Sequence, residues 1–386
     1  MKYFWPACLA LFLAASAIAQ NQFVYTNNNV STGINQNPVN SVSAFKIDAD
    51  GSLTQVKGSP YKTGGAGGGN SIDPEEIAIA TQGNANFLYA ANDGSGTISA
   101  YAINPVGGSL ARVPGSPFLA DGAPGGDYSL AASPNGQFLF ATADTATDIH
   151  IYSVGSNGSL SEIAGSPFPT GANSEGLKVT PNGKFLVVGE NSLKAVGVYS
   201  IGVSGALTAV AGSPFPASAS PFDVEVNCAG NLVFVIDNGS FNGSYSVIDA
   251  YSMSSGGSLT PIAGEPFYNG TSSTNGGLAL SPNGQFLFVT DTFSNDISSM
   301  SVASDGALSQ VAGSPFATSS WTGGVSVSRS GKFVYSALFT VAQIDGRAVD
   351  STGALTPVPG TPFSTGQAQT GVPTVITFPP RSCSAP

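Results

Sequence analysis

Charged side chains are scarce in this chain of 386 residues, and positive ones are the scarcest. Only 9% of the residues are charged, and 12 Lys and Arg stand against 23 Asp and Glu, which gives a formal net charge of −11. A chain with this balance repels phosphate backbones and anionic lipid headgroups. The sequence therefore excludes a nucleic-acid-binding role, and we expect no nucleic acid among its partners.

Histidine and cysteine are almost missing as well. The single histidine, His150, cannot build a zinc site of the usual multi-histidine type. Of the three cysteines, Cys8 lies in an apolar leader, which leaves Cys228 and Cys383. An oxidising compartment permits a disulfide between these two, which would pin the end of the chain. A free thiol or a pairing between molecules is the alternative.

Long apolar runs are missing beyond the N-terminus. Residues 1–19 have a minimal basic start, an apolar stretch and a small-x-small cleavage pattern, Ala17-Ile18-Ala19, before Gln20. This pattern predicts a signal peptide, and the residues before Cys8 make a poor lipid-attachment motif. No later segment approaches the 18 or so apolar residues of a membrane span. We expect a mature protein that is secreted or periplasmic.

No segment shows an apolar period of 3.6 residues, so the sequence predicts almost no helix. Gly and Pro are abundant instead, at 49 and 26 residues. A motif of the form Gly-Ser-Pro-Phe recurs seven times, each copy five residues after a Leu that follows Gly-Ser or Gly-Ala. The copies begin at Gly58, Gly115, Gly165, Gly212, Gly264, Gly313 and Gly360.

Each repeat has the pattern of four short strands joined by turns. In the sixth copy the strands are predicted at 277–280, 286–289, 297–302 and 308–312, with Ser281-Pro282-Asn283-Gly284 as a tight turn. Seven such units indicate an all-β fold, a seven-bladed β-propeller. The chain starts at a second-strand pattern, Phe23-Val24-Tyr25, and the missing strand appears at 372–378. We predict a signal peptide at 1–19, one propeller at 20–378 whose ring this C-terminal strand closes, and a tail at 379–386.

Three aligned columns follow the third strand of each repeat. The first is aliphatic, and the aromatic column three residues later, from Phe45 to Tyr251 with Met300 in the sixth copy, is typical of contacts between blades. His150 lies in the column between them, where other copies have Ser, Gly or Asp. We interpret it as a partly buried, hydrogen-bonded side chain, with a catalytic role as the alternative.

Acidic residues gather in the two sets of loops that reach one face of such a ring. A solvated acidic rim is the simple interpretation, and a cation site such as Ca²⁺ is the sharper one. Trp321, in a loop between two blades, is a candidate for stacking on a sugar or peptide, or an anchor of its loop. The loops between the second and third strands carry Asp93, Asp144, Glu190, Asp237 and Asp291, and the loops between blades carry Asp73, Glu75, Glu76, Asp121, Asp127, Glu175 and Asp223.

The Gly-x-Leu turn, the Ile-Ser-x-Tyr third strand and the Ser-Pro-Asn-Gly-x-Phe-Leu motif resemble those of the lactonase-type seven-bladed propellers. That family comprises bacterial 6-phosphogluconolactonase-like proteins and fungal carboxymuconate cyclases, and the resemblance covers most of residues 22–378. It implies a secreted bacterial member. The family's His-Pro-His-Gly stretch is replaced here by Gly126-Asp127-Tyr128-Ser129, Asn173-Ser174-Glu175-Gly176 and Pro221-Phe222-Asp223.

We therefore expect a non-catalytic binding or scaffold propeller that presents its acidic face to a protein, a glycan, a small molecule or a cation. The alternative is a lactonase-like hydrolase or cyclase acting on a sugar lactone or related uncharged molecule. In that case Glu175 would serve as general base, with His150 or Arg347 as the convergent donor. We expect a monomer and no cofactor, with Ca²⁺ as the one possible ligand ion.

Overall fold

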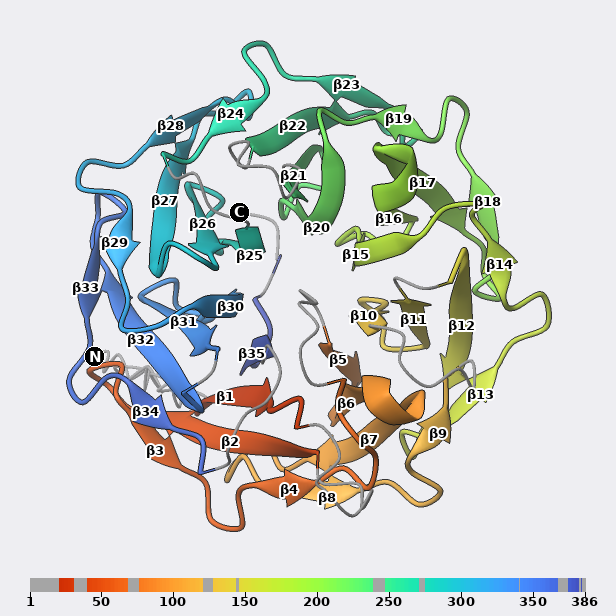
Figure 1. The fold of residues 1–386 in the computed structure, drawn as a ribbon. Helices are drawn as coiled ribbons and strands as arrows, with labels where there is room; N and C mark the ends of the chain where they lie inside the picture. Colours follow the sequence, from red (N-terminus) through yellow and green to blue (C-terminus); the bar gives the residue numbers. More distant parts are fainter. Residues whose placement is uncertain are drawn as a thin grey trace, which may run out of the picture.

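The computed structural model is a ring of seven β-sheets around a central channel (Figure 1). It describes residues 21–30, 40–68, 76–120, 128–143, 146–238, 247–270, 275–339, 341–366, 374–381 and 383. The predicted signal peptide, Asp73, Glu75, Asp121, Asp127 and Asp144 lie outside these residues. The all-β, seven-bladed architecture predicted from the repeats is confirmed.

The first two strands of each blade form its inner half and run antiparallel. The inner strands are β35 (Thr374–Phe378), β5 (Ile77–Gln82), β10 (Tyr128–Ala132), β15 (Ser174–Val179), β20 (Ser220–Val226), β25 (Asn275–Leu280) and β30 (Thr322–Val327). The second strands are β1 (Gln22–Asn27), β6 (Ala85–Asn92), β11 (Phe138–Ala143), β16 (Phe185–Glu190), β21 (Leu232–Asn238), β26 (Phe286–Asp291) and β31 (Phe333–Leu338). We number the blades in chain order, so that β35, β1 and the next three strands form blade one.

The outer half of each blade has a long third strand whose outer edge pairs with two short strands in succession. The third strands are β2 (Ser41–Ile47), β7 (Thr97–Ile103), β12 (Asp148–Val154), β17 (Ala195–Ile201), β22 (Val247–Met253), β27 (Asp296–Val302) and β32 (Gln343–Val349). The fourth are β3 (Leu53–Gln55), β8 (Leu110–Arg112), β13 (Leu160–Glu162), β18 (Leu207–Ala209), β23 (Leu259–Pro261), β28 (Leu308–Gln310) and β33 (Leu355–Pro357). The fifth are β4 (Tyr61–Lys62), β9 (Phe118–Leu119), β14 (Phe168–Pro169), β19 (Phe215–Pro216), β24 (Phe267–Tyr268), β29 (Phe316–Ala317) and β34 (Phe363–Ser364).

The Gly-Ser-Pro-Phe motif stands at the break between the two short strands. There the outer edge leaves one N–H of the third strand without a backbone acceptor, and the motif's serine supplies one. In blade three the Ser166 hydroxyl accepts the hydrogen bond of the Ile151 N–H at 2.9 Å. The same contact recurs in all seven blades, with Thr361 in blade seven and the Glu265 carboxylate in blade five. The serine of the repeat therefore accepts the hydrogen bond of a third-strand N–H that would have no partner at the break.

The ring closes by pairing of the two ends of the chain. The second strand of blade one, β1, pairs antiparallel with β35, from Phe23 opposite Phe378 to Asn27 opposite Thr374. Blade one thus takes its inner strand from the C-terminal end and its other strands from the N-terminal end. This pairing satisfies the inner edge of β1, which an open ring would leave bare.

Neighbouring blades pack through aromatic rings against tight glycine turns. Gly158, in the turn between the third and fourth strands of blade three, has φ +84°, and a Cβ there would lie 2.4 Å from the Phe87 ring of blade two. The Tyr89 hydroxyl donates to the Gly158 carbonyl at 3.0 Å in the same contact. The aromatic column acts in the same way, since Tyr152 of blade three donates to the Ala120 carbonyl of blade two.

Two faces of the ring differ in the connections they carry. We call the loop face the one that carries the second-to-third strand loops and the connections between blades. It also bears both short helices, η1 (Asp93–Ser95) and η2 (Asn191–Leu193), and is the face seen in Figure 1. The opposite turn face carries the Pro-Asn-Gly turns and the end of β35. Among the described residues, no helix is long and apolar enough to span a membrane.

The C-terminal tail crosses the turn face. Beyond β35 in blade one, Cys383 forms a disulfide with Cys228, which lies in the first-to-second strand turn of blade five. The Arg381 guanidinium contacts Glu225 of β20 in the same blade at 2.7 Å. Blades one and five are separated by two others on the shorter way round, so the tail passes beneath the channel.

The glycine turns generate the first prediction. Gly158→Ala should destabilise the protein by about 2–4 kcal/mol, since the new Cβ adds overlap with Phe87 to the strain of a positive φ. Gly165→Ala is the matched control, because Gly165 has φ +91° and nothing within 4 Å of its added Cβ. It should lose only about 1 kcal/mol. Urea unfolding of both variants measures the difference, and equal losses would contradict the packing argument.

Candidate functional site

Beneath the surface of the loop face, several blades contain a buried pair of hydrogen-bonded polar side chains. They join the end of the second strand to the third strand of the same blade. The Asn28 amide donates to Ser43 at 2.9 Å in blade one, and Asn92 donates to Ser99 at 2.8 Å in blade two. In blade six the Ser298 hydroxyl donates to Asp291 at 2.7 Å. The carboxylate of Asp291 therefore occupies a position where other blades have an amide.

All but one of the described acidic residues expected in the loops of this face are inside the protein, and the exception, Glu175, is half-buried. Asp93, Asp237 and Asp291 are fully buried, and Glu190 and Asp223 are 1% and 2% exposed. They bind groups that the sheets leave unsatisfied, because the inner strands have bulges and loops there. Asp93 of blade two accepts from the Tyr128 N–H of blade three at 3.4 Å, and Asp223 of blade five from the Leu278 N–H of blade six at 3.0 Å.

Glu190 pairs with a tyrosine of the aromatic column. The Tyr199 hydroxyl donates a short hydrogen bond to the Glu190 carboxylate. Burial raises the pKa of Glu190 above its ordinary value, and the Tyr199 hydrogen bond only partly offsets this. A Cβ on Gly197, between them on the third strand, would collide with the carboxylate. Glu190 thus fills the space that Gly197 leaves by having no side chain.

Blade five places two carboxyl groups against each other. Asp237 ends the second strand and Asp249 lies on the third, in the same relation as Asn28 and Ser43. Burial, followed by the charge of Asp249, raises the pKa of Asp237 to about 8. Asp249 accepts from the N–H and the hydroxyl of Ser218, both at 2.6 Å. These surroundings favour the neutral, protonated form of Asp237.

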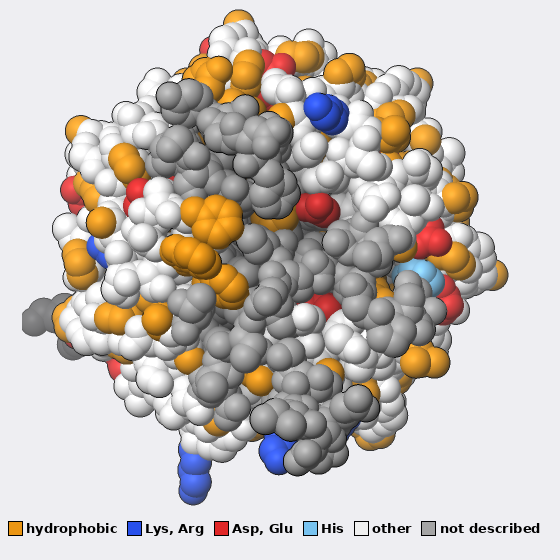
Figure 2. Space-filling view, viewed as in Figure 1, with side chains coloured by type: hydrophobic (Ala, Val, Ile, Leu, Met, Phe, Trp, Pro, Cys, Tyr) orange, Lys and Arg blue, Asp and Glu red, His pale blue; other side chains and the backbone are white. Residues whose placement is uncertain are grey.

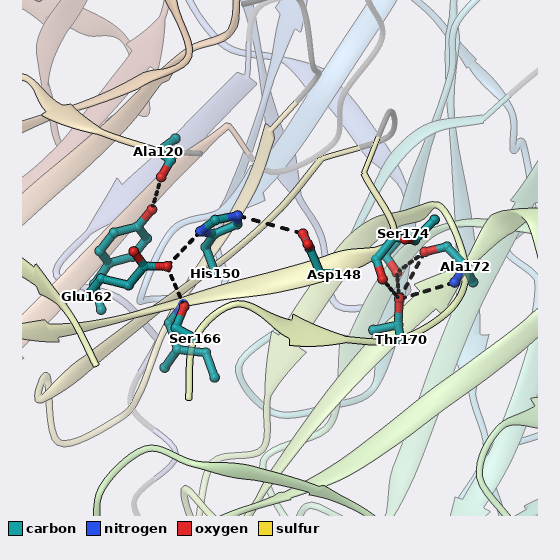
Figure 3. Close-up of polar contacts among 11 residues, drawn as sticks. Ala120, Asp148, His150, Glu162, Ser166, Thr170, Ala172 and Ser174 are labelled. Carbon is teal, nitrogen blue, oxygen red and sulfur yellow. Dashed lines mark hydrogen bonds and ion pairs between the residues drawn. The ribbon is translucent and has the colours of Figure 1, made fainter. Parts of the chain in front are cut away.

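His150 lies in the outer half of blade three. Its Nδ1 is 2.9 Å from the Glu162 carboxylate and its Nε2 is 3.7 Å from Asp148 (Figure 3). Glu162 also accepts from Ser166, the serine that fills the strand break of this blade. The imidazole is hydrogen-bonded and its side chain only 13% exposed. This geometry matches the simple interpretation of His150 as a structural side chain.

The three residues proposed for catalysis do not converge. His150 is on β12 and Arg347 on β32, which lie on opposite sides of the ring (Figure 1). Arg347 binds Asp345 at 2.5 Å and donates to the Ala317 carbonyl at 2.7 Å. Glu175 is on the inner strand β15 of blade four. Neither donor reaches the base that the enzyme hypothesis requires.

The channel contains a cavity of about 490 Å³ in its turn-face half. All seven inner strands line it, and the tail adds Pro380, Arg381 and Cys383. Its charged side chains are Asp223, Glu225, Lys178 and Arg381, two of each sign. Glu225 is 6% exposed and lies 2.7 Å from Arg381 and 3.8 Å from Lys178. The positive charges of the cavity are thus paired with acid.

The loop face also carries an aromatic cluster, which we define as Phe293, Trp321 and Phe339. The Trp321 and Phe339 rings stack 5.6 Å apart, and the Phe293 ring meets Trp321 edge-on at 5.1 Å. Phe293 is 44% and Trp321 38% exposed. Figure 2 shows a group of hydrophobic side chains on this side of the face, above β26 and β30. Three loops from blades six and seven build the cluster.

Several residues of these sites were not predicted from the sequence. Glu225, Lys178 and Arg381 meet only because the tail returns to blade five. Phe293 and Phe339 are in loops outside the repeat pattern, and only their large apolar side chains in expected loops could have identified them. For a metal, no group of three or more His, Cys, Asp or Glu side chains comes together within the described part of the chain.

The carboxyl pair of blade five generates a prediction about pH. Because the folded pKa of Asp237 is raised, the stability it contributes is lost as pH rises from about 4 toward 8. Asp237→Asn keeps the shape without the charge and should flatten this dependence. We expect its advantage over the native protein to grow by about 1–3 kcal/mol between pH 6 and pH 8, since one proton is worth about 1.4 kcal/mol per pH unit.

Asp291→Asn is the matched control for this measurement. Asp291 accepts hydrogen bonds on both oxygens, from Ser298 and from the Asn269 amide at 2.5 Å, and an amide nitrogen in place of one oxygen would lose one of them. Its amide variant should be destabilised at both pH values. Urea unfolding at pH 6 and pH 8 separates the two cases, and a pH dependence of Asp237→Asn parallel to that of the native protein would contradict the raised pKa of Asp237.

The sequence model of the family described as "Lactonase, 7-bladed beta-propeller" matches residues 37–172, which comprise the outer part of blade one and the strands of blades two and three. No curated protein matches the chain.

Solved structures with the same fold cover almost the whole chain. A putative 6-phosphogluconolactonase from Bacteroides fragilis has a TM-score of 0.72 at 17% identity, covering 93% of this chain and 99% of its own. One from Bacteroides uniformis gives 0.70 at 14%, with coverage of 92% and 100%. A periplasmic gluconolactonase from Pseudomonas aeruginosa gives 0.64 at 18%, with coverage of 92% and 98%. The resemblance indicated by the repeats is thereby confirmed: the chain is a seven-bladed β-propeller similar to the lactonase-type propellers.

Proposed function

We propose that this protein is an extracytoplasmic, non-catalytic propeller that binds an uncharged carbohydrate on its loop face through the aromatic cluster. The observation that carries the proposal is the contrast between the two kinds of side chain on that face. Of the described acidic residues expected on this face all but the half-buried Glu175 are buried, whereas Phe293 and Trp321 are exposed. This exposure favours the aromatic cluster over the described acidic residues as the binding surface of this face.

The chemistry of the cluster favours a sugar. Exposed aromatic rings present flat apolar surface, and a pyranose offers a flat apolar face of C–H groups with hydroxyls at its edge. Polar atoms for those hydroxyls lie beside the rings, since Ser294 is next to Phe293 and its hydroxyl is 3.0 Å from Asp296. A net charge of −11 disfavours anionic ligands.

An extracytoplasmic location agrees with two features. Residues 1–19 have the composition of a signal peptide, and the Cys228–Cys383 disulfide is of a kind found in oxidising compartments. One of the similar structures is that of a periplasmic protein.

A second candidate function is hydrolysis of an uncharged sugar lactone. It is favoured by the similarity to a periplasmic gluconolactonase and by Glu175, a carboxylate on an inner strand. Its weakness is the lack of convergence between Glu175, His150 and Arg347. The substrate of this candidate is a lactone without a phosphate, because the positive charges that line the channel are paired with Glu225.

Trp321 provides a direct test of the carbohydrate proposal. A protein that begins at Gln20 retains Trp321 as its only tryptophan, because Trp5 lies in the leader. Neutral oligosaccharides that stack on the cluster should change its fluorescence in a saturable way. Phe293→Ala should weaken the binding about 5- to 30-fold, the effect of losing about 1–2 kcal/mol of ring contact.

Tyr268→Ala is the matched control, since Tyr268 is 61% exposed but lies in the outer strand β24, away from the cluster. It should bind like the native protein. Equal weakening by both substitutions would point to a non-specific effect, and a glycan array without any bound sugar would contradict the proposal.

The lactone candidate is tested with the same protein. Glucono-1,5-lactone hydrolysis should not exceed the spontaneous rate if the non-catalytic proposal is correct. Turnover above that rate, lost by at least 100-fold in Glu175→Gln but retained in His150→Gln, would establish the second candidate with Glu175 as its base. Titration of the released acid at constant pH measures both rates.

A further inference from the structure

The turn-face mouth of the channel already has an occupant, which is part of the chain itself. The tail residues Pro380, Arg381 and Cys383 line the cavity together with the inner strands. One side of the cavity is therefore built by a segment that enters after the ring is complete. Two contacts of the described tail residues hold this segment on blade five.

The first contact is a buried site for a guanidinium group. Arg381 donates to the Glu225 carboxylate at 2.7 Å and also to the Val226 carbonyl. Glu225 is 6% exposed, and its other oxygen lies 3.8 Å from Lys178 on β15. Its first oxygen also accepts from the Val226 N–H at 2.9 Å. A carboxylate this buried needs a cation beside it, so Arg381 and Glu225 stabilise each other's charges only while the tail is docked.

The second contact is covalent. Cys383, two residues beyond Arg381, is joined to Cys228 in the turn that follows β20. The disulfide therefore returns the tail to the same blade that holds the guanidinium. It keeps Arg381 at a high effective concentration near Glu225, so a modest ion pair suffices to hold the tail.

We propose that the tail is a plug for the turn-face mouth of the channel, seated by Arg381 in the Glu225 site and latched by the Cys228–Cys383 disulfide. A dithiol reductant opens the latch by thiol–disulfide exchange. It gives two electrons and two protons to the S–S bond, leaving two thiols on the protein and a cyclic disulfide on the reductant. Arg381 then loses the high effective concentration that the disulfide gave it, so the chain end opens far more often and uncovers the mouth.

Trypsin reports the position of the tail, because it cleaves after Arg381 and must extract the guanidinium from the Glu225 site. The oxidised protein should resist this cleavage. Treatment with dithiothreitol, or the Cys228→Ser/Cys383→Ser double variant, should accelerate it at least tenfold. Cleavage after Arg329, which lies exposed in a turn of blade seven on the same face, is the internal control and should keep its rate.

Lys178 reports whether the cavity opens when the tail leaves. Its side chain is 30% exposed beside Glu225. Its acetylation by a small amine-reactive reagent, followed by peptide mass spectrometry, should rise at least threefold after reduction. Lys57, exposed in an outer turn of blade one, is the control and should label at one rate in both states.

Equal cleavage after Arg381 in the oxidised and reduced proteins would overturn the latch. Faster cleavage without a change at Lys178 would overturn the plug, since the tail would then move without uncovering the cavity. If reduction also accelerates cleavage at Arg329, the fold itself has loosened. The test then becomes Arg381→Ala with its disulfide intact, in which an unchanged labelling rate of Lys178 overturns the proposal and a threefold rise supports it.

Discussion

The pairing of β1 with β35 is the constraint on which the rest of this structure depends. Each blade buries its apolar faces only against two neighbours, so a ring with one open seam would expose two of these faces and the inner edge of β1. Closure joins residues separated by almost the whole chain, from Phe23 to Phe378. The disulfide and the Arg381 ion pair follow directly beyond this seam, and they hold the tail on a blade that the closing strand does not itself contact.

Within the closed ring, several buried carboxylates join neighbouring blades by accepting hydrogen bonds from them. Inner strands have bulges near the loop face, so backbone N–H groups there lose their ladder partners. Asp93 and Asp223 accept such hydrogen bonds from the next blade, and Glu76 accepts from Asn27 and Asn29 of the preceding one. An acid that already accepts hydrogen bonds inside the protein is removed from water, which makes it a poor ligand for a cation or a partner. The aromatic side chains of Phe293 and Trp321 are exposed on the same face.

Blade five departs from the common pattern at both of its polar positions. Asp249 takes the place of a serine on the third strand, and Glu265 takes the place of the serine in the Gly-Ser-Pro motif. Burial raises the pKa of Glu265 to about 7, so this blade contains two carboxyl groups whose pKa is well above the ordinary value, Asp237 and Glu265. The same blade contains Cys228 and Glu225, which bind the tail, and Asp223, which lines the channel.

The sequence by itself determined the number of blades, the position of the strands and the seam between the termini. These are local properties: a strand alternates, a turn needs Gly or Pro, and the repeat multiplies each signal by seven. The interruption of the outer strand at Gly-Ser-Pro was missed, since a serine that replaces a ladder acceptor looks like a turn residue. Only the tertiary structure decided which acids are buried, that His150, Glu175 and Arg347 stay apart, and that Phe293, Trp321 and Phe339 meet. The physical reason is that burial and charge pairing depend on neighbours across blades, and no spacing along one repeat records what the next blade places against it.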